Sequence, residues 1–340
     1  MSLLNIQSNI SLRPYHTFHI NVAAKKFATF SNVDELSELL QSSANQKNRL
    51  ILGGGSNILF TKDYDGIVLK NEIKGIDVVK EDADHVYIRV GAGENWHQFV
   101  LHSINKELGG VENLSLIPGN VGASPMQNIG AYGVEIKEVF ETLTAFHLND
   151  KKIVQFSLND CQFGYRESVF KNKYKDQFVI LDVIYRLNKF PKFNTSYGAI
   201  EEELQRMRVK ELSIKAISQA VINIRSSKLP DPDQIGNAGS FFKNPTIASG
   251  QFAELKISYP TIPSYPVSPS LVKVPAAWLI DQCGWKGYRK GDAGCHAKQA
   301  LVLVNYGTAS GNEIYDLSEE ILQTVQKKFG ITLEREVNIV

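Results

Sequence analysis

Three short segments contain residues whose types and spacing could do chemistry, and the first is GGGSN (53–57). It follows directly after the apolar run RLIL. Glycines let backbone amides approach an anion without an intervening Cβ, and the serine and asparagine add side-chain donors. The segment indicates either a phosphate-binding loop or a tight turn after a strand, and a short glycine motif alone leaves both readings open.

The second segment, IPGNVGASPMQNIGAYG (117–133), has little to bury and many groups that can donate hydrogen bonds. Its glycines would admit an extended ligand, and Ser124, Gln127 and Asn128 could bond to the ligand's edges. A structureless loop of this length is usually functional or disordered, and this one is too apolar for disorder. Two such loops after strands fit a large dinucleotide along a sheet edge. The first loop lacks the GK[ST] ending of a Walker loop, and GAGENWH (91–97) lacks the third glycine of a Rossmann fingerprint.

The third segment, GNAGSFFKNP (236–245), raises the question of what Ser240 does. A serine in a glycine-rich turn usually serves the turn, and the alternative is a hydroxyl held against a reactive group. Near the C-terminus, Glu334 and Glu336 alternate within ITLEREVNIV (331–340), and period-two alternation places both on one face of a strand. Two carboxylates on one face usually belong to a solvated face, and the residues alone do not choose between them.

Short strands and helices must position these segments. The patterns predict strands at 49–52, 66–71, 85–93, 178–187, 300–305 and 331–340, and helices at 31–43, 95–108, 213–225 and 313–329. Ser31 or Asn32 caps the first helix, Gly330 ends the last, and His97 is interpreted as a residue on a helix flank. Several strands precede any crossover helix, so the pattern favours an α+β fold over a doubly wound sheet. Turn-forming residues at 226–245 suggest a domain boundary near 226.

Length and composition exclude several classes of protein. The chain has 340 residues, which predicts about two domains, and it is 43% hydrophobic and 21% charged with a net charge of +1. This nearly neutral balance lacks the excess of positive charge that is typical of proteins that bind nucleic acid or an anionic membrane. Three cysteines without a CxxC pair argue against a disulfide framework or structural zinc, and His16 and His19 lack the partners of a metal site. Without a signal peptide or an apolar run of ~18 residues, we expect a cytoplasmic protein.

Eight segments in order resemble one known family. They are LGGGSNILF, GAGENWH, IPGNVGASPMQNIGAYG, FGYRES, LPDP, NAGSFFKNP, AAWLIDQCGWKG and LEREV. From about residue 13 to the C-terminus, the chain is similar to the UDP-N-acetylenolpyruvoylglucosamine reductases, also called UDP-N-acetylmuramate dehydrogenases. The resemblance implies an α+β, vanillyl-alcohol-oxidase (PCMH-type) FAD-binding fold with subdomains at 1–75 and 76–225. A C-terminal α+β substrate-binding domain would occupy 226–330, and a strand at 331–340 would contain Glu336.

The resemblance also implies non-covalent FAD, with NADPH as the reductant. The pyrophosphate would lie near the first loop and the flavin and ribityl chain along the second. The residues assigned to FAD are Gly53, Gly54, Gly55, Ser56, Asn57, Ile117, Pro118, Gly119, Gly122, Ala123, Ser124, Gln127, Asn128, Ile129, Gly130, Ala131 and Tyr132. Ala123 stands where serine is common in the family, and Ser124 remains beside it.

The family's reaction would place hydride on an enol ether conjugated to a carboxylate, so negative charge develops next to the carboxylate. Arg166 of FGYRES could bind that carboxylate bidentately, although without the resemblance it reads as a surface arginine in an ion pair. Tyr165 could orient it. By resemblance, Glu336 assists Arg166 as a protonated acid, and Ser240 is the general acid that protonates the carbon. The two phenylalanines after Ser240 would exclude water.

Further matches concern the substrate, UDP-N-acetylglucosamine enolpyruvate. The segment NTSYGAIEEEL (194–204) resembles an aromatic turn called the tyrosine loop, in which Tyr197 closes over the substrate. Lys228 and Asn244 match positions that hold the diphosphate, and Gln299 matches one that binds the nucleotide sugar. The resemblance brings no nucleic-acid or membrane partner, and we expect a monomer.

Two other functions remain open. One is a carbohydrate or alcohol oxidase of the same flavin fold, but such enzymes often tether the flavin through a histidine or cysteine, and neither glycine-rich loop contains one. The other is a nucleotide-sugar-binding protein without catalysis, which the combination of Arg166, Ser240 and Glu336 argues against.

Overall fold

The computed structural model describes residues 5–46 and 48–340, and it divides into two compact units. The first unit contains the described residues up to Ile10, together with Ala24–Gly54 and Asp65–Ser227. The second contains Ser11–Ala23, Gly55–Tyr64 and Lys228–Val340. Two N-terminal segments thus belong to the second unit, which no linear division of the chain would produce. The expected boundaries, with subdomains at 1–75 and 76–225, a C-terminal domain at 226–330 and a strand at 331–340, stay a prediction.

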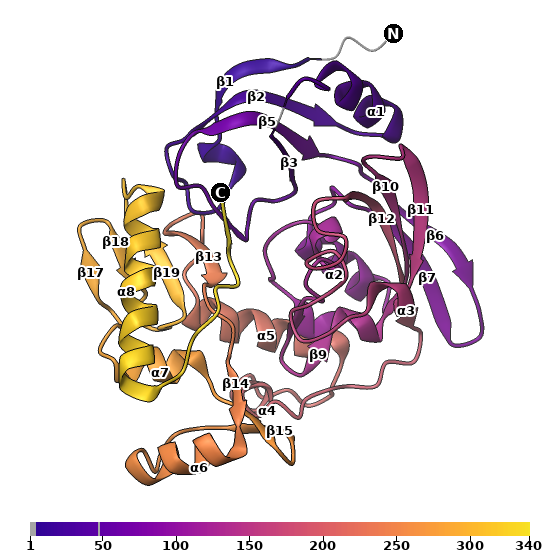
Figure 1. Ribbon diagram of the computed structural model, residues 1–340. Helices are drawn as coiled ribbons and strands as arrows, with labels where there is room; N and C mark the ends of the chain where they lie inside the picture. Colours follow the sequence, from indigo (N-terminus) through magenta and orange to yellow (C-terminus); the bar gives the residue numbers. More distant parts are fainter. Residues whose placement is uncertain (1–4, 47) are drawn as a thin grey trace. The chain divides into compact units, whose positions relative to one another are not determined.

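The first unit is built on two main sheets (Figure 1). One has four strands in the order β1 (Gln7–Ser11), β2 (Ala23–Phe30), β5 (Tyr64–Asn71), β3 (Arg49–Leu52), with β3 parallel to β5. The other has five antiparallel strands in the order β11 (Lys152–Ser157), β10 (Phe140–His147), β12 (Phe178–Asn188), β7 (His85–Gly91), β6 (Ile76–Glu81). Two-residue strands β8 (Gly130–Ala131) and β9 (Val134–Glu135) form a small hairpin.

Helices of the first unit begin where the sequence supplies caps and apolar stripes. They are α1 (Val33–Ser42), α2 (Trp96–Asn105), α3 (Leu158–Cys161), α4 (Gly198–Arg206) and α5 (Ile214–Lys228), whose last residue lies in the second unit. The Asn32 side chain accepts a hydrogen bond from the Glu35 amide and so caps α1, as predicted. The Asn95 side chain caps α2 in the same way, through the Gln98 amide.

Aromatic rings dominate the core around the five-stranded sheet. Trp96 and Phe99 of α2 are buried together with Tyr185 of β12. The Phe99 and Tyr185 rings stack with their centroids 4.8 Å apart, and Trp96 meets both rings edge-on. This cluster fixes the N-terminal end of α2 against the sheet.

The second unit contains the remaining elements. One sheet has four strands in the order β13 (Gly236–Ser240), β19 (Val302–Asn305), β18 (Ala293–Cys295), β17 (Arg289–Lys290). A second has three strands in the order β14 (Thr246–Ala248), β16 (Leu271–Lys273), β15 (Tyr265–Ser268). The third is the parallel pair β20 (Asn338–Ile339) and β4 (Ile58–Leu59). Its helices are α6 (Ser249–Ser258), α7 (Ala276–Gln282) and α8 (Gly311–Phe329). Ser310 and Glu313 form a capping box at the start of α8, and Gly330 ends it with φ +66°, as predicted.

Two of the predicted elements differ in extent. The predicted ten-residue strand at 331–340 is wrong, because only Asn338–Ile339 forms a regular strand. The preceding residues are held by separate bonds instead, including an isolated bridge between Phe242 and Arg335. The aromatic turn expected at 194–204 is partly wrong as well, because residues from Gly198 onward form α4.

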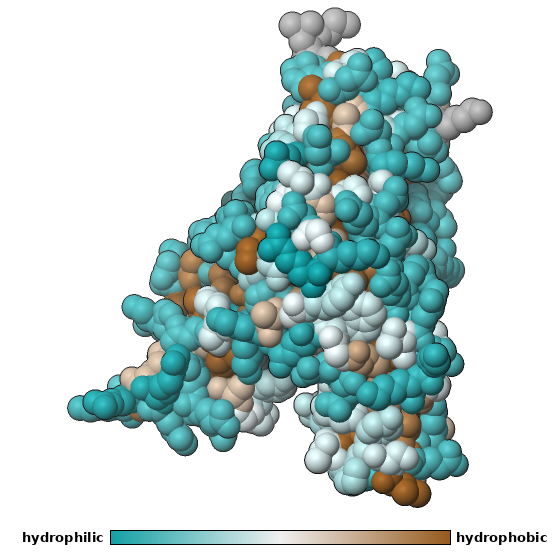
Figure 2. Space-filling view, turned by 90° about the vertical axis from the view of Figure 1, so that its left-hand side faces the viewer, coloured by the Kyte–Doolittle hydropathy of each residue, from teal (hydrophilic) through white to brown (hydrophobic). Residues whose placement is uncertain are grey.

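The surface is mainly polar where Figure 2 shows it. Teal residues cover most of that face, and brown ones are scattered among them rather than gathered in one broad patch. Among the described residues, no helix is both long and apolar enough to cross a membrane.

Candidate active site

The first glycine loop, GGGSN (53–57), begins where β3 ends and is packed too tightly for side chains at two positions. A Cβ on Gly54 would lie 2.8 Å from the Gly119 Cα, so the two glycine-rich loops are in backbone contact. Gly55 has φ +62°, and a Cβ there would lie 2.1 Å from the carbonyl oxygen of Tyr15. Both positions therefore require glycine, which agrees with a backbone-lined binding loop.

The second loop (117–133) is ordered by its own hydrogen bonds rather than structureless. Residues Val121–Ala123 form a 3-10 turn, and β8 belongs to the loop as well. The buried Asn128 side chain donates to Glu135 Oε2 at 2.8 Å and accepts from the Lys137 amide at 3.1 Å. The buried Ser124 hydroxyl lies 2.6 Å from the Tyr185 hydroxyl. These two side chains hold the loop in shape, and their contact with FAD stays a prediction.

Most of the other loop residues predicted for FAD are half-buried or exposed, and Ile129 is the exception among them. Ile129 is buried, and its amide donates to Ser124 within the loop. The half-buried or exposed ones are Ile117, Pro118, Gly119, Gly122, Ala123, Gln127, Gly130, Ala131 and Tyr132. The loop therefore offers mostly backbone and small side chains to a ligand.

Arg166 lies on the loop after α3 and contacts the second glycine-rich loop. Its backbone has φ +56°, which is uncommon for a residue with a side chain. Its Nη2 donates to the carbonyl oxygen of Gly130 at 2.8 Å, and its guanidinium carbon lies 5.9 Å from the centre of the exposed Tyr165 ring. The structure thus brings Arg166 to the predicted flavin loop, and its role toward the substrate stays a prediction.

Arg225 is a candidate site residue that sequence reasoning missed. It lies on α5, donates from Nε to the carbonyl oxygen of Leu116 at 3.3 Å, and bonds to the Tyr132 side chain. Burial lowers the pKa of Arg225, and the charge of Arg166 lowers it further. No carboxylate pairs with Arg225 anywhere in the described chain. A half-buried positive charge of this kind suits an electron-rich or anionic ligand.

One signal in the sequence could have revealed Arg225. It follows Val221 by four residues and so falls on the apolar side of the predicted helix, next to Ile224. A charge at that position needs a polar partner somewhere in the fold.

Tyr197 is the residue immediately before α4, and it is 46% exposed. Its ring meets the Tyr132 ring edge-on, with centroids 5.3 Å apart. The tyrosine loop therefore lies against the second glycine-rich loop. Asn113 strengthens this link, because its amide group donates both to Tyr132 O and to Asn194 O.

Ser240 ends β13 and is exposed. Gly239 has φ +69°, and the pairing of β13 with β19 shifts register between Asn237 and Ser240, so a bulge turns this side chain out of the regular pattern. Phe241 and Phe242 are fully buried and pack on each other at 5.3 Å. Both rings thus belong to the core, while Ser240 is exposed, and their shielding of the hydroxyl from water stays a prediction.

Backbone bonds fix Glu336 beside this strand. Its amide donates to Phe241 O at 2.8 Å, and its carbonyl oxygen accepts from the Asn57 side chain at 3.2 Å. Glu336 is half-buried, whereas Glu334 is exposed and forms an ion pair with Lys243 at 2.5 Å. Within the second unit, the C-terminal segment thus joins the end of the GGGSN loop to the segment after Ser240.

The predicted substrate residues of the second unit are less closely grouped. Lys228 is exposed at the end of α5. Asn244 accepts from the Ala276 amide at 2.9 Å, at the start of α7. The half-buried Gln299 accepts a hydrogen bond from the Val302 amide through its backbone oxygen at 3.1 Å, and Val302 pairs with Ser240. Their roles toward the substrate stay predictions.

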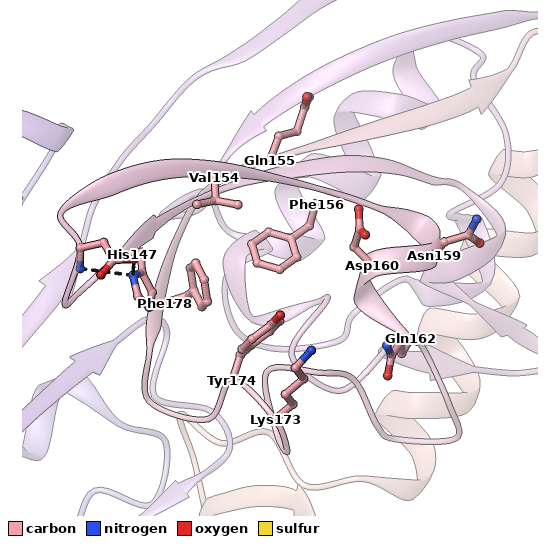
Figure 3. A pocket seen from close by; sticks show the side chains of 11 residues that line it. His147, Val154, Gln155, Phe156, Asn159, Asp160, Gln162, Lys173, Tyr174 and Phe178 are labelled. Carbon is pink, nitrogen blue, oxygen red and sulfur yellow. Dashed lines mark hydrogen bonds and ion pairs between the residues drawn. The ribbon is translucent and has the colours of Figure 1, made fainter.

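A pocket of about 540 Å³ elsewhere on the first unit contains none of the predicted residues (Figure 3). Phe156, Tyr174 and Phe178 turn their rings toward its centre, and His147 forms an ion pair with Asp150 at 3.0 Å at one side. The rings pack on one another at 5.0 to 6.0 Å, so they fill much of the space between them. This pocket lacks the glycine-lined backbone of the predicted site. No group of three potential metal ligands occurs among the residues that the structure describes.

Two family models match the chain. Residues 231–340 match the one described as UDP-N-acetylenolpyruvoylglucosamine reductase, C-terminal domain, and residues 24–154 match the one described as FAD binding domain. The second match spans both glycine-rich loops. The chain therefore contains an FAD-binding domain, and the predicted cofactor is confirmed.

Curated relatives cover nearly the whole chain. The protein named UDP-N-acetylenolpyruvoylglucosamine reductase in Flavobacterium johnsoniae is 51% identical over 338 residues, which are 99% of this chain and 100% of that protein. The protein of the same name in Amoebophilus asiaticus is 50% identical, with the same coverage. That of Pseudomonas syringae pv. tomato is 46% identical over 99% of each chain.

Solved structures support the fold. The crystal structure of UDP-N-acetylenolpyruvylglucosamine reductase from Thermus caldophilus covers 99% of both chains with a TM-score of 0.70 and 23% identity. The 6-hydroxy-D-nicotine oxidase of Arthrobacter nicotinovorans covers 97% of this chain and 87% of its own, with a TM-score of 0.50 and 12% identity. Likeness at these identities concerns the fold alone, and it confirms the predicted α+β, vanillyl-alcohol-oxidase-type architecture.

Proposed function

Because the chain belongs to the UDP-N-acetylenolpyruvoylglucosamine reductase family, we propose that it reduces UDP-N-acetylglucosamine enolpyruvate to UDP-N-acetylmuramate, a peptidoglycan precursor, with FAD as cofactor and NADPH as reductant. The observation that supports this function most directly is the hydrogen bond from Arg166 to Gly130, at 2.8 Å. It joins a residue suited to the substrate's carboxylate to the loop suited to the flavin.

The residues present fit FAD. Gly54 and Gly119 approach so closely that the two loops form one backbone-lined surface, on which an extended dinucleotide can lie. The amides of the first loop suit the pyrophosphate, and the second loop suits the flavin and its ribityl chain. Arg225, bonded to Tyr132 of the second loop, suits an electron-rich edge of the cofactor. FAD, when bound and reduced, supplies the hydride that the methylene carbon of the substrate accepts.

The chain's own residues bind the substrate and move the proton. Arg166 binds the substrate carboxylate through its planar guanidinium and stabilises the charge that spreads into it. Glu336, as a protonated acid, donates a hydrogen bond to the same carboxylate. Ser240 donates the proton from Oγ to the carbon next to the carboxylate, and nearby donors must stabilise the resulting alkoxide.

Other residues hold the remainder of the nucleotide sugar. Lys228 and Asn244 bind the diphosphate, Gln299 contacts the nucleotide sugar, and Tyr197 covers the substrate. Since the sequence contains no Rossmann fingerprint that would bind NADPH separately, NADPH and the sugar use the same pocket in turn, and NADPH leaves before the sugar enters. We further propose that the enzyme acts in the cytoplasm as a monomer, with its substrate-binding domain starting near residue 226.

Two half-reactions measured separately test these roles. Ser240→Ala is expected to leave the reduction of FAD by NADPH unchanged and to slow reoxidation by the sugar roughly 10²- to 10⁴-fold, because only the second step needs the proton donor. Ser258→Ala, at the exposed end of α6, serves as the matched control and should affect neither step. Equal slowing of both half-reactions in Ser240→Ala would contradict its assignment as the general acid.

A further inference from the structure

The first turn of α2 forms hydrogen bonds to residues 114–119, where the chain enters the second glycine-rich loop. Trp96 Nε1 donates to Leu114 O at 2.9 Å, and the Trp96 amide donates to Gly119 O at 3.0 Å. Between these two bonds, the Leu116 amide donates to His97 Nδ1 at 3.0 Å. His97 lies half-buried on α2, as predicted, and its side chain bonds to the residue directly before Ile117, which the sequence did not reveal.

Leu116 needs such support because its backbone is strained. It has φ +58°, a left-handed conformation that residues with a branched side chain seldom adopt. Both of its polar backbone groups are bonded to side chains from other elements: the amide to His97 of α2, and the carbonyl oxygen to Arg225 of α5 at 3.3 Å. Strained residues persist where the surroundings determine them, and they concentrate at ligand sites.

The bond from Leu116 requires His97 to be neutral, since only an unprotonated Nδ1 can accept a hydrogen bond from the Leu116 amide. Burial lowers the pKa of His97 from its ordinary value, and the charge of Arg225 lowers it further. The positive end of the α2 dipole acts in the same direction. The acids nearest along the chain are engaged elsewhere: Glu94 accepts from the Gly75 amide at 2.9 Å and faces Lys74 at 3.7 Å, and Glu112 accepts from the Gly110 amide at 2.6 Å.

We propose that His97 is a positioning residue for FAD: its neutral imidazole holds Leu116, and thereby the second glycine-rich loop, in the shape that binds the cofactor. Protonation of His97 places an N–H against the Leu116 amide, breaks this bond and releases the start of the loop. FAD affinity then falls in acid. This inference rests on the proposed function, because it takes the loop to be part of the FAD site.

The experiment titrates FAD into apoprotein at pH values from about 5 to 8 and follows the quenching of flavin fluorescence. His97→Asn keeps an acceptor close to the position of Nδ1 but does not titrate, whereas His97→Phe removes the acceptor. His102→Asn, on the same helix, is the matched control. At the highest pH, the Asn variant is expected to bind FAD as the unaltered chain does, and the Kd of the Phe variant to rise on the order of tenfold.

The pH profile separates positioning from a merely structural role. For the unaltered chain and the His102 control, Kd is expected to rise as pH falls through the lowered pKa of His97, and this rise is expected to be absent in His97→Asn. Parallel profiles for the unaltered chain and His97→Asn would overturn the inference, even if His97→Phe failed to fold. Failure of the unaltered chain to bind FAD at any pH would refute the proposed function itself.

Discussion

Replacing Gly54 by alanine tests whether the two glycine-rich loops form one surface. A Cβ at this position would lie 2.8 Å from Gly119 Cα, 3.1 Å from Gly119 C and 2.9 Å from Asn120 Oδ1. Two of these atoms are backbone, and the Asn120 side chain is itself held by a hydrogen bond to Gly93 O at 3.1 Å. None of the three can move aside without displacing the second loop.

The size of the effect follows from these distances. Carbon atoms that are not bonded to each other rest about 3.5–4.0 Å apart, so the loops must separate by roughly 1 Å at this point. Overpacking of this kind costs about 1–3 kcal/mol. If FAD binding must restore the original spacing, the Kd for FAD is expected to rise roughly tenfold to a hundredfold. The free energy of unfolding of the apoprotein is expected to fall by less, because the loops can relax when no ligand spans them.

FAD titration of apoprotein and urea unfolding measure the two quantities. Gly53→Ala is the neighbouring control, since its Cβ would meet Asn120 Cβ at an ordinary 3.7 Å. Gly250→Ala in α6 is the distant control, with no atom within 4 Å of the new Cβ, and it is expected to leave FAD binding unchanged. If Gly54→Ala bound FAD as tightly as the unaltered chain, the loops would not be in contact in solution, and the proposed surface would be wrong.

Three further outcomes are expected. Glu336→Gln should abolish turnover while FAD stays bound, and Glu334→Gln at the exposed position should keep turnover. A steady-state assay with the sugar measures turnover in both variants. The reverse pattern would exchange the roles of the two glutamates. Burial lowers the pKa of His16 to about 4 from an ordinary 6.5, so the unfolded chain binds the proton more readily. The free energy of unfolding therefore has its full value above about pH 6.5 and falls by up to about 3 kcal/mol as pH drops toward 4. Urea unfolding at several pH values should show a smaller fall in His16→Asn. A double-mutant cycle of Ser124→Ala and Tyr185→Phe should give a coupling of about 1 kcal/mol in the same unfolding measurement, and strict additivity would argue against their 2.6 Å contact.

Local signals in the sequence were enough to predict the elements that begin and end with recognisable residues. Asn32 caps α1 and Gly330 ends α8, because each position solves a problem of backbone hydrogen bonding within a few residues. The strand predicted at 331–340 failed for the opposite reason. Alternating burial of Ile331, Leu333 and Val337 is real, but a regular ladder needs a continuous partner, and the alternation itself does not reveal whether one exists.

Residues of the proposed site were predicted where glycine or a complete motif indicated them, and they were missed where their contacts come from a distant part of the chain. Gly54 and Gly55 could be predicted from the glycine run alone. His97 and Arg225 act on Leu116, which lies 19 and 109 residues away along the chain. A histidine in a first turn is common on surfaces, and the apolar position of Arg225 indicates only that it needs a polar partner, so the fold is needed to show that both act on Leu116.

Glu334 and Glu336 differ in what their parts of the C-terminal segment bond to, and the choice between them as a reacting carboxyl group stays a prediction. Period-two alternation would place both carboxylates on the same side of a strand, so the sequence does not distinguish them. The structure separates them through their neighbours. The Glu334 backbone accepts from Lys243 and its carboxylate pairs with the same residue, which occupies it at the exposed side. Glu336 instead bonds through its amide to Phe241, directly after Ser240. We expect the reacting carboxyl group at Glu336, because its amide bonds next to the proposed proton donor, Ser240.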